Sequence, residues 1–212
     1  MPIYFKRAHS AFLCLILVML CAVLPAQAAT PFAGLSPAEV ATLQKGEVVI
    51  KEEKQHTGDN EKNVRKTVVA RMIIERHVEA VWRVISDQPL MFSKDPRVKS
   101  VKVVKKLSTA EELINYQIKL GRMLPDFDYT TRVNYRKPTY AVFKRESGDF
   151  KDFRSEFFLL PVNGGKHTYV TYSMYVDVGF FIPKFVTRAI IKGDIPEIAE
   201  NVRKVVYQKN PQ

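Results

Sequence analysis

Aromatic and methionine side chains recur through this chain of 212 residues, at positions where strands and short loops are expected. Such side chains suit adaptable apolar pockets, and each methylene group of a ligand that they bury contributes about 0.8 kcal/mol. We therefore predict a cavity that binds a lipid or another hydrophobic small molecule, although the same residues could instead fill an ordinary core. The predicted ligand-binding residues are Trp82, Met91, Phe92, Tyr116, Met123, Phe127, Tyr129, Tyr172, Met174, Phe181 and Phe185.

The stretch VEAVWRVISDQPLMFSKDPRV, residues 78–98, holds the only tryptophan of the chain. Apolar residues at the spacing i, i+3, i+4 and i+7 from Val78 predict a short helix, with Trp82 at the edge of the core. Two prolines then bracket a loop with room for little more than one helical turn. We predict that Met91 and Phe92 in this loop form the mouth of the cavity, together with a second loop at 121–127.

Catalytic and metal-binding signatures are absent from the sequence. His56, His77 and His167 lie far apart and form no H-E-x-x-H pattern, and no nucleotide-binding glycine loop occurs. We expect no cofactor and no metal. The carboxylates Asp126, Asp128, Asp149 and Asp152 fall at strand ends and are interpreted as solvated turn residues. Side chains that could polarise a carbonyl keep a cyclase or dehydratase activity open as an alternative: Tyr129, Arg132, Tyr172 and Tyr175.

The first 28 residues have the order of a secretory signal peptide. Lys6 and Arg7 precede an apolar run, and Ala26-Gln27-Ala28 provides small residues at a cleavage site. The apolar run is shorter than the roughly 20 residues of a spanning helix, and a retained anchor is the alternative. This pattern predicts export to the periplasm. Both cysteines lie in the removed segment, so the mature chain is predicted to have no disulfide and no reactive thiol.

The net charge of +11 favours contact with anionic surfaces. Export makes an anionic membrane a better candidate than nucleic acid, and a generally basic surface without a partner is the alternative. Oligomeric state cannot be inferred from the sequence. The basic residues expected to face the membrane are Lys99, Lys102, Lys105, Lys106, Lys184, Arg188 and Lys192.

The order of the predicted elements is helix, two strands, short helix, several strands and long helix. A capping box from Ser36 to Glu39 begins the first helix, at 37–45. Residues 47–55 and 66–75 form a hairpin by pattern, and alternating runs joined by short polar turns fill residues 97–178 and predict an antiparallel meander. The segment 183–208 is predicted to be a helix across the sheet. It either breaks near Gly193, with a new capping box at Asp194, or kinks at Pro196.

With these residues the chain resembles the START-like, or SRPBCC, helix-grip superfamily, and within it the polyketide cyclase and coenzyme-Q-binding branch. The resemblance covers residues 46–208 and is carried by VEAVWRVISD, by the late hairpin SGDFKDFRSEFFLLPVNGGKHTYVTYSMYVDV and by the closing segment FFIPKFVTRAIIKGDIPEIAENVRKVV. It implies an α+β fold in which a curved antiparallel sheet wraps around a long C-terminal helix, with a ligand cavity between them.

These observations give one prediction of domain organisation and function. Residues 1–28 form a signal peptide, 29–45 an N-terminal extension with a helix, 46–208 the ligand-binding domain and 209–212 a tail. The protein is predicted to carry a hydrophobic molecule without turning it over. Two alternatives are a cyclase or aromatase acting on a polyketide-like substrate, and an interaction module with a filled core.

Overall fold

The computed structural model describes residues 31–56, 64–119, 124–181 and 193–210. The chain divides into two units, residues 1–33 and 34–212, and all the described helices and strands belong to the second unit. Its elements are α1 (Pro37–Gln44), β1 (Val49–His56), β2 (Val64–Ile74), α2 (Val78–Ile85), α3 (Gln88–Met91), β3 (Val98–Lys106), β4 (Glu111–Lys119), β5 (Asp126–Arg136), β6 (Tyr140–Gly148), β7 (Asp152–Val162), β8 (His167–Asp177) and α5 (Asp194–Lys209).

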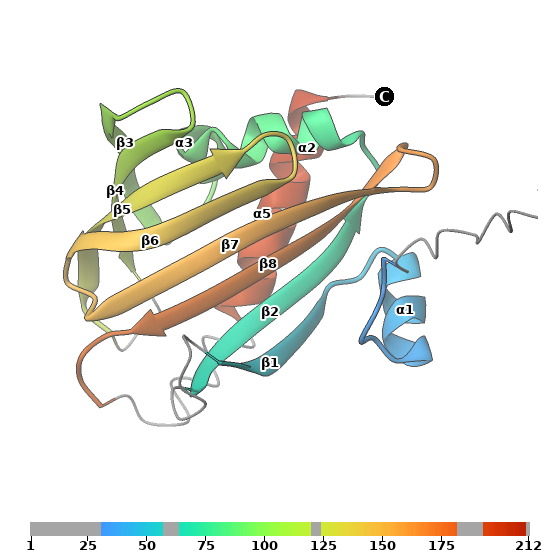
Figure 1. Cartoon of the computed structure of the whole chain (residues 1–212), viewed down its shortest axis with the longest axis horizontal. Helices are drawn as coiled ribbons and strands as arrows, with labels where there is room; N and C mark the ends of the chain where they lie inside the picture. The colour runs from blue at the N-terminus through green and yellow to red at the C-terminus, as the bar shows by residue number, and fades with distance from the viewer. Residues whose placement is uncertain (1–30, 57–63, 120–123, 182–192, 211–212) are drawn as a thin grey trace, which may run out of the picture. The chain divides into compact units, whose positions relative to one another are not determined.

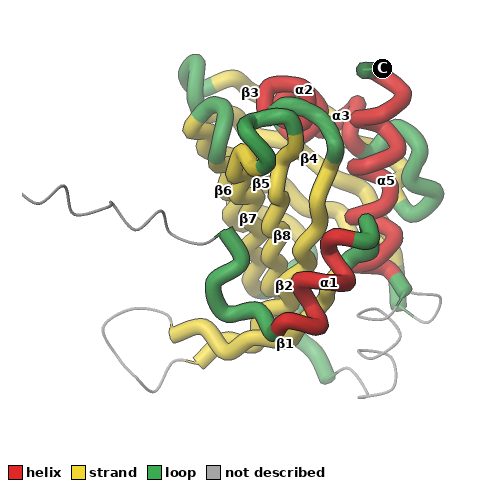
Figure 2. The backbone as a smooth tube through the Cα atoms, turned by 90° about the vertical axis from the view of Figure 1, so that its right-hand side faces the viewer, coloured by secondary structure: helices red, strands yellow, loops and turns green. Residues whose placement is uncertain are grey.

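The eight described strands form one antiparallel sheet in the order β1-β2-β8-β7-β6-β5-β4-β3. The predicted hairpin of β1 and β2 and the predicted meander from β3 to β8 are therefore confirmed. The sheet curves, and α5 lies along its concave side (Figures 1 and 2). This arrangement confirms the predicted fold class, an α+β fold in which a curved antiparallel sheet wraps around a C-terminal helix.

Alternation along the strands decides which side chains enter the core. In β5, the buried residues Phe127, Tyr129, Thr131 and Val133 alternate with more exposed neighbours. Successive side chains of a strand point to opposite faces of the sheet, so this alternation places one apolar face on the concave side. The core lies between this face and the apolar faces of α2 and α5.

Short helix α2 packs as its apolar stripe predicts, with Val78, Val81 and Ile85 buried. His77 caps it, because the imidazole Nδ1 accepts a hydrogen bond from the Glu79 N–H at 3.3 Å. Trp82 is also buried and meets the ring of Tyr135 edge-on, with ring centroids 5.9 Å apart. A helix of this length depends on such packing, since it is marginal alone.

The predicted capping box of α1 is confirmed. The Glu39 carboxylate accepts a hydrogen bond from the Ser36 N–H at 2.7 Å, and Ser36 Oγ accepts from the Glu39 N–H. Glu39 also forms an ion pair with Lys51 of β1, with 2.6 Å between the charged atoms. The hydrogen bond from Lys51, with those from Ser36, lowers the pKa of Glu39 to about 2. This pair connects α1 with the edge of the sheet.

The second predicted capping box is wrong. The N-cap of α5 is Gly193, which has no side chain to accept a hydrogen bond, and Asp194 is already the first helical residue. Whether the chain breaks or kinks before this point concerns residues 182–192, which lie outside the described residues. The other end of α5 is anchored to the connection between β2 and α2. Arg76 in this connection donates from Nε to the Asn210 carbonyl at 2.7 Å, and its guanidinium lies 4.6 Å from the centre of the Tyr207 ring.

Gly148 ends β6 directly opposite Tyr129 of β5. Its φ of +105° lies in the region that favours glycine, and a Cβ at this position would overlap the Asp128 carbonyl and the Tyr129 backbone. The close approach of the two strands at this point therefore requires a residue without a side chain, and it fixes the backbone that carries Tyr129.

Candidate functional site

A cavity of about 60 Å³ lies between the concave face of the sheet and the helices α3 and α5. A buried water needs roughly 10–15 Å³ of such space, so a few waters fit. A drug-sized ligand needs about 300–1,000 Å³, so it does not fit without rearrangement. The described lining residues are Gln88, Met91, Phe92, Asp95, Arg97, Val98, Tyr116, Ile118, Lys119, Tyr129, Thr131, Phe143, Phe150, Phe153, Ser155, Phe157, Tyr172, Met174, Val176 and Ile198.

Aromatic rings in contact with one another form much of the cavity wall. Tyr116 and Tyr129, which are paired across β4 and β5, stack with ring centroids 5.1 Å apart. Tyr129 also meets Phe150 at 4.6 Å, and Phe157 stacks on Tyr172 at 4.6 Å. Offset and tilted pairs of this kind are favourable geometries for rings and leave their remaining faces apolar. The wall is therefore suited to contact with flat or aliphatic apolar groups.

One buried hydrogen-bond chain crosses this apolar wall. The Tyr116 hydroxyl donates to Gln88 Oε1 at 2.9 Å, and Gln88 Nε2 donates to the Ile85 carbonyl at 2.6 Å. Gln88 belongs to α3 and is buried. Its amide thus links the end of α2 to β4 and is satisfied within the protein, so it positions the tyrosine rather than offering a free group to a ligand.

The tyrosine hydroxyls of the cavity are neutral over the physiological pH range. Burial is the main cause that raises the pKa of Tyr116, Tyr129 and Tyr172 above the ordinary value. A phenol with a raised pKa is a hydrogen-bond donor and a poor general base near pH 7. The cavity therefore presents neutral hydroxyl groups.

Charged residues of the cavity pair with each other near the start of β3. The Arg97 guanidinium contacts the Asp95 carboxylate at 2.6 Å, and the Asp95 side chain is almost fully buried. The same guanidinium lies 3.5 Å from Glu197 on α5. Asn201 of α5 donates a hydrogen bond of 2.7 Å to the Met91 carbonyl. These contacts hold the α3 loop against α5 beside the cavity.

The structure brings together on the cavity wall six of the residues that the sequence predicted: Met91, Phe92, Tyr116, Tyr129, Tyr172 and Met174. Trp82 and Phe127 are buried in the core but do not line the cavity. Phe181 lies beyond the end of β8 and is 85% exposed. Met123 and Phe185 lie outside the described residues. Whether any of these residues binds a ligand remains a prediction.

Several polar residues of the cavity were not found by sequence reasoning, namely Gln88, Asp95, Arg97, Thr131 and Ser155. Gln88, Asp95 and Arg97 belong to a proline-bracketed loop whose composition resembles that of an exposed turn. The alternation of buried and exposed residues along β5 could have indicated that Thr131 faces the cavity, because Thr131 lies on the same face of the strand as Tyr129 and Val133.

Apart from its tyrosines, the described lining of the cavity holds three ionisable residues, Asp95, Arg97 and Lys119. The carboxylate of Asp95 is paired with Arg97. None of the cavity-lining residues that the structure describes is a histidine or a cysteine. Within the described ranges, no group of three or more metal-ligating side chains is close enough to hold a metal ion.

Comparison with solved structures shows the same fold in proteins of low sequence identity. A START superfamily protein from Mycobacterium smegmatis matches with a TM-score of 0.59 and 15% identity over 68% of this chain and 99% of its own. The lipid transfer and protein localization domain of human StarD13 matches with a TM-score of 0.55 and 15% identity over 82% and 95%.

An enzyme also has this fold. The Zhui aromatase/cyclase from Streptomyces sp. R1128 matches with a TM-score of 0.56 and 9% identity over 68% of this chain and 96% of its own. A search of curated protein sequences finds no match. The family model for polyketide cyclase / dehydrase and lipid transport matches residues 74–203, more than half of the sequence, from the end of β2 into α5. The chain therefore belongs to the polyketide cyclase / dehydrase and lipid transport family.

Proposed function

We propose that this protein binds a lipid or another hydrophobic small molecule in the cavity between sheet and α5 and carries it without chemical change. The observation that carries the proposal is the cavity wall, which combines stacked aromatic rings with neutral hydroxyl groups. Burial of apolar ligand surface against such a wall contributes roughly 25 cal/mol per Å². Family membership supports the proposal, since the family description includes lipid transport.

Loading requires the cavity to grow well beyond 60 Å³. Two polar contacts are found between α5 and the described part of α3 and the loop that follows it. They are the hydrogen bond from Asn201 to the Met91 carbonyl and the looser ion pair between Arg97 and Glu197. Glu197 is largely exposed, and exposed ion pairs contribute at most about 1 kcal/mol. We infer that α3 moves away from α5 to admit the ligand, with Met91 and Phe92 at the opening.

Two other functions each have one observation in their favour. The polar residues of the cavity, with the likeness to an aromatase/cyclase, favour an enzyme that polarises a carbonyl with tyrosine hydroxyls. The small volume favours an interaction module with a nearly filled core. The carrier accounts for the apolar wall and for the pairing of Asp95, the one carboxylate among the described lining residues, with Arg97.

The place of action is also part of the proposal. We infer export across the inner membrane to the periplasm, on the signal-peptide pattern of residues 1–28, which lie outside the described residues. Among the described helices, none is both long and apolar enough to span a membrane. Within the family, the sequence resemblance favours the coenzyme-Q-binding branch. Quinones are therefore among the ligands to be tested.

Native mass spectrometry of residues 29–212, produced with export and purified without detergent, tests the carrier function. We expect a bound lipid or quinone in stoichiometric amount, released unchanged on organic extraction. Stripped protein should then reload from a panel of phospholipids, fatty acids and quinones. A protein that is purified empty and takes up nothing from the panel contradicts the carrier, and a chemically altered ligand points to the enzyme.

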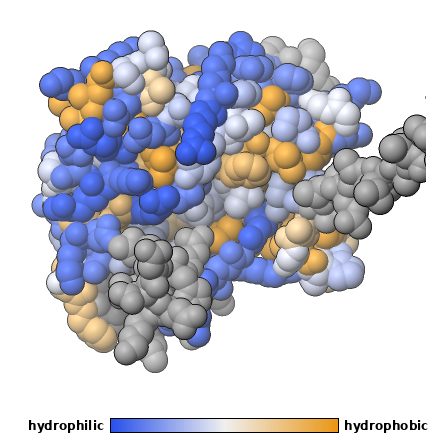
Figure 3. All heavy atoms as spheres, viewed as in Figure 1, coloured by the Kyte–Doolittle hydropathy of each residue, from blue (hydrophilic) through white to orange (hydrophobic). Residues whose placement is uncertain are grey.

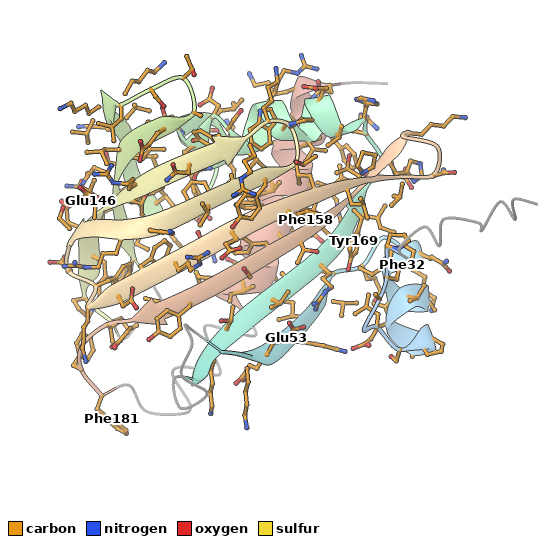
Figure 4. The ribbon with its side chains drawn as sticks, in the orientation of Figure 1. Phe32, Glu53, Glu146, Phe158, Tyr169 and Phe181 are labelled. Carbon is orange, nitrogen blue, oxygen red and sulfur yellow. The ribbon has the colours of Figure 1, made fainter. Side chains whose placement is uncertain are left out.

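Membrane contact is the second part of the proposal, and the loop after β8 is its best candidate. Phe180 is 50% exposed and Phe181 is 85% exposed, and Phe181 lies beyond the end of β8 (Figure 4). Hydrophilic and hydrophobic residues both reach the face seen in Figure 3. Among the large hydrophobic residues that are exposed in the described ranges, Phe180 and Phe181 are the two adjacent aromatic residues. Aromatic side chains are favoured at the membrane–water interface.

Cations accompany this aromatic pair at the same end of the sheet. Lys151 lies beside Gly179, and Lys99 and Lys119 lie at the neighbouring ends of β3 and β4. Lysines near an anionic surface contribute about 1 kcal/mol each, and salt screens this attraction. Of the other predicted basic residues, Lys102, Lys105 and Lys106 lie on the edge strand β3, while Lys184, Arg188 and Lys192 lie outside the described residues.

Replacing both Phe180 and Phe181 with serine is expected to weaken binding to phosphatidylglycerol vesicles at least about tenfold, because each buried phenylalanine contributes about 1.5–3 kcal/mol. Vesicle co-sedimentation at two salt concentrations measures the effect. Phe158→Ser is the matched control, since Phe158 is 46% exposed but lies on the outer face of β7 (Figure 4). Equal loss in the control, or no loss in the double variant, contradicts the assignment.

A further inference from the structure

Three hydroxyl groups of the cavity lack an adequate hydrogen-bond partner. Thr131 is fully buried, and its Oγ1 makes no hydrogen bond. The Thr131 side chain lies close enough to Tyr116 to lower the pKa of the Tyr116 phenol, although burial raises this pKa by more. The Tyr129 hydroxyl makes no hydrogen bond with a described residue. The Tyr172 hydroxyl donates to the weak acceptor Met174 Sδ, at 3.4 Å, and the Ser155 side chain lies near enough to lower the pKa of this phenol against the larger effect of burial.

Unpaired buried hydroxyls are costly and need an explanation. Leaving such a group without a partner costs about 1–3 kcal/mol, and native proteins contain few of them. The three hydroxyls here all line one cavity, and the electrostatic coupling of Tyr129 with Tyr172 and of Tyr116 with both places their phenols near one another. The cavity has room for a few waters, which can satisfy these groups until a ligand displaces them.

The chemistry of these groups restricts the ligand. Because the phenols stay protonated, Tyr129 and Tyr172 donate hydrogen bonds and suit an acceptor oxygen. A carboxylate would need a free cation beside these hydroxyls for compensation. The guanidinium of Arg97 is already paired with Asp95, and Lys119, the other basic residue of the lining, is exposed at the end of β4. A pure hydrocarbon would displace the waters and leave all three hydroxyls unpaired. A neutral carbonyl oxygen satisfies two donors at once.

We propose that the hydroxyls of Tyr129, Thr131 and Tyr172 form a subsite for a neutral carbonyl oxygen of the ligand, as in a ketone, an ester or a quinone. This inference rests on the proposed carrier function and sharpens it. The apolar part of the ligand lies against the aromatic wall, and its carbonyl accepts hydrogen bonds at this subsite. The preferred ligand is therefore a hydrophobic molecule with a neutral carbonyl group.

A matched pair of probes tests the subsite, namely 2-acetylnaphthalene and 2-isopropylnaphthalene, which share a ring system and differ in the carbonyl. Isothermal titration calorimetry on ligand-stripped residues 29–212 is expected to show about tenfold tighter binding of the ketone, because two hydrogen bonds are gained and each contributes up to several-fold. Thr131→Val and Tyr129→Phe should each reduce this preference about threefold. The reduction should come mainly from weaker binding of the ketone.

Tyr135→Phe is the control, because the Tyr135 hydroxyl donates to Glu112 at 2.7 Å and Tyr135 does not line the cavity. It should leave the preference unchanged. Thr131→Val provides a second readout, since it removes a hydroxyl that has no protein partner and should change the melting temperature little. A marked fall in the melting temperature means that the hydroxyl bonds to another protein group in the free protein, which contradicts the inference.

The failure of this inference can be distinguished from that of the carrier function. If both probes bind equally well, or if Thr131→Val and Tyr129→Phe leave the preference intact, the subsite is wrong while the carrier stands. If neither probe binds and the lipid panel also fails, the carrier function is wrong, and the subsite with it.

Discussion

Replacing Gly148 with alanine is expected to lower the free energy of unfolding by at least about 3 kcal/mol, the largest single-site effect that we predict. The backbone of Gly148 has a φ of +105°, which strains any L side chain. The added Cβ would also overlap the Asp128 carbonyl and the backbone of Tyr129. These are main-chain atoms of a paired strand, so relief requires β5 and β6 to separate at the position that carries Tyr129.

Gly165→Ala is the matched control for this prediction. Gly165 also has a positive φ, of +85°, but no atom lies within 4 Å of its added Cβ. It should therefore show only the conformational cost, about 1 kcal/mol. Urea unfolding followed by circular dichroism measures both variants. Similar losses at Gly148 and Gly165 would mean that crowding against β5 contributes nothing, contrary to this account.

Loss of stability above pH 10 is the second large effect. Burial raises the pKa of Tyr116, Tyr129 and Tyr172 in the folded protein, while the unfolded chain titrates near pH 10. Below pH 10 both states are protonated, and the contribution of these groups to stability is fully present. As the pH rises above 10, the unfolded state releases protons that the folded state retains, and stability is lost.

Each of these tyrosines is expected to reduce the free energy of unfolding by about 1.4 kcal/mol per pH unit, or about 4 kcal/mol per unit for the three together. Urea unfolding between pH 8 and pH 11.5 gives the slope, and absorbance at 295 nm reports phenolate formation. Tyr135, Tyr140 and Tyr169 also have raised pKa values and add to the measured slope. Tyr129→Phe should therefore lower the slope by about 1.4 kcal/mol per pH unit, without losing a hydrogen bond to a described residue. An unchanged slope in this variant would mean that Tyr129 ionises equally in both states.

The architecture could be predicted from the sequence because strands with one buried face leave a period-two pattern. In β5 the alternation of Tyr129 and Val133 with Thr130 and Arg132 fixes which side faces the core. The capping box at Ser36 is likewise local, since its partner is three residues away. The box expected at Asp194 was wrong because the same local pattern cannot reveal that the helix has already begun at that residue.

The candidate site could be predicted only in part, because cavity walls are defined by contacts between distant segments. Gln88 gains its role from Tyr116, which is 28 positions away in the sequence and belongs to another element. Trp82 and Tyr116 are both buried aromatic residues, and nothing in their local sequence tells that only Tyr116 reaches the cavity. Residue type therefore indicated an apolar interior. Which of the apolar residues line the cavity depends on tertiary packing.

The open ends of the sheet determine what can change when the interior expands. The order of the described strands ends at β1 on one side and at β3 on the other, and these two strands do not pair with each other. A closed barrel has a circumference fixed by its inter-strand hydrogen bonds, whereas this sheet can change its curvature with every strand pair intact. When the cavity expands, the contacts that change are therefore the apolar contacts between sheet and helix, which are non-directional. We expect the cavity volume to increase gradually with the size of the ligand, without a switch between two states.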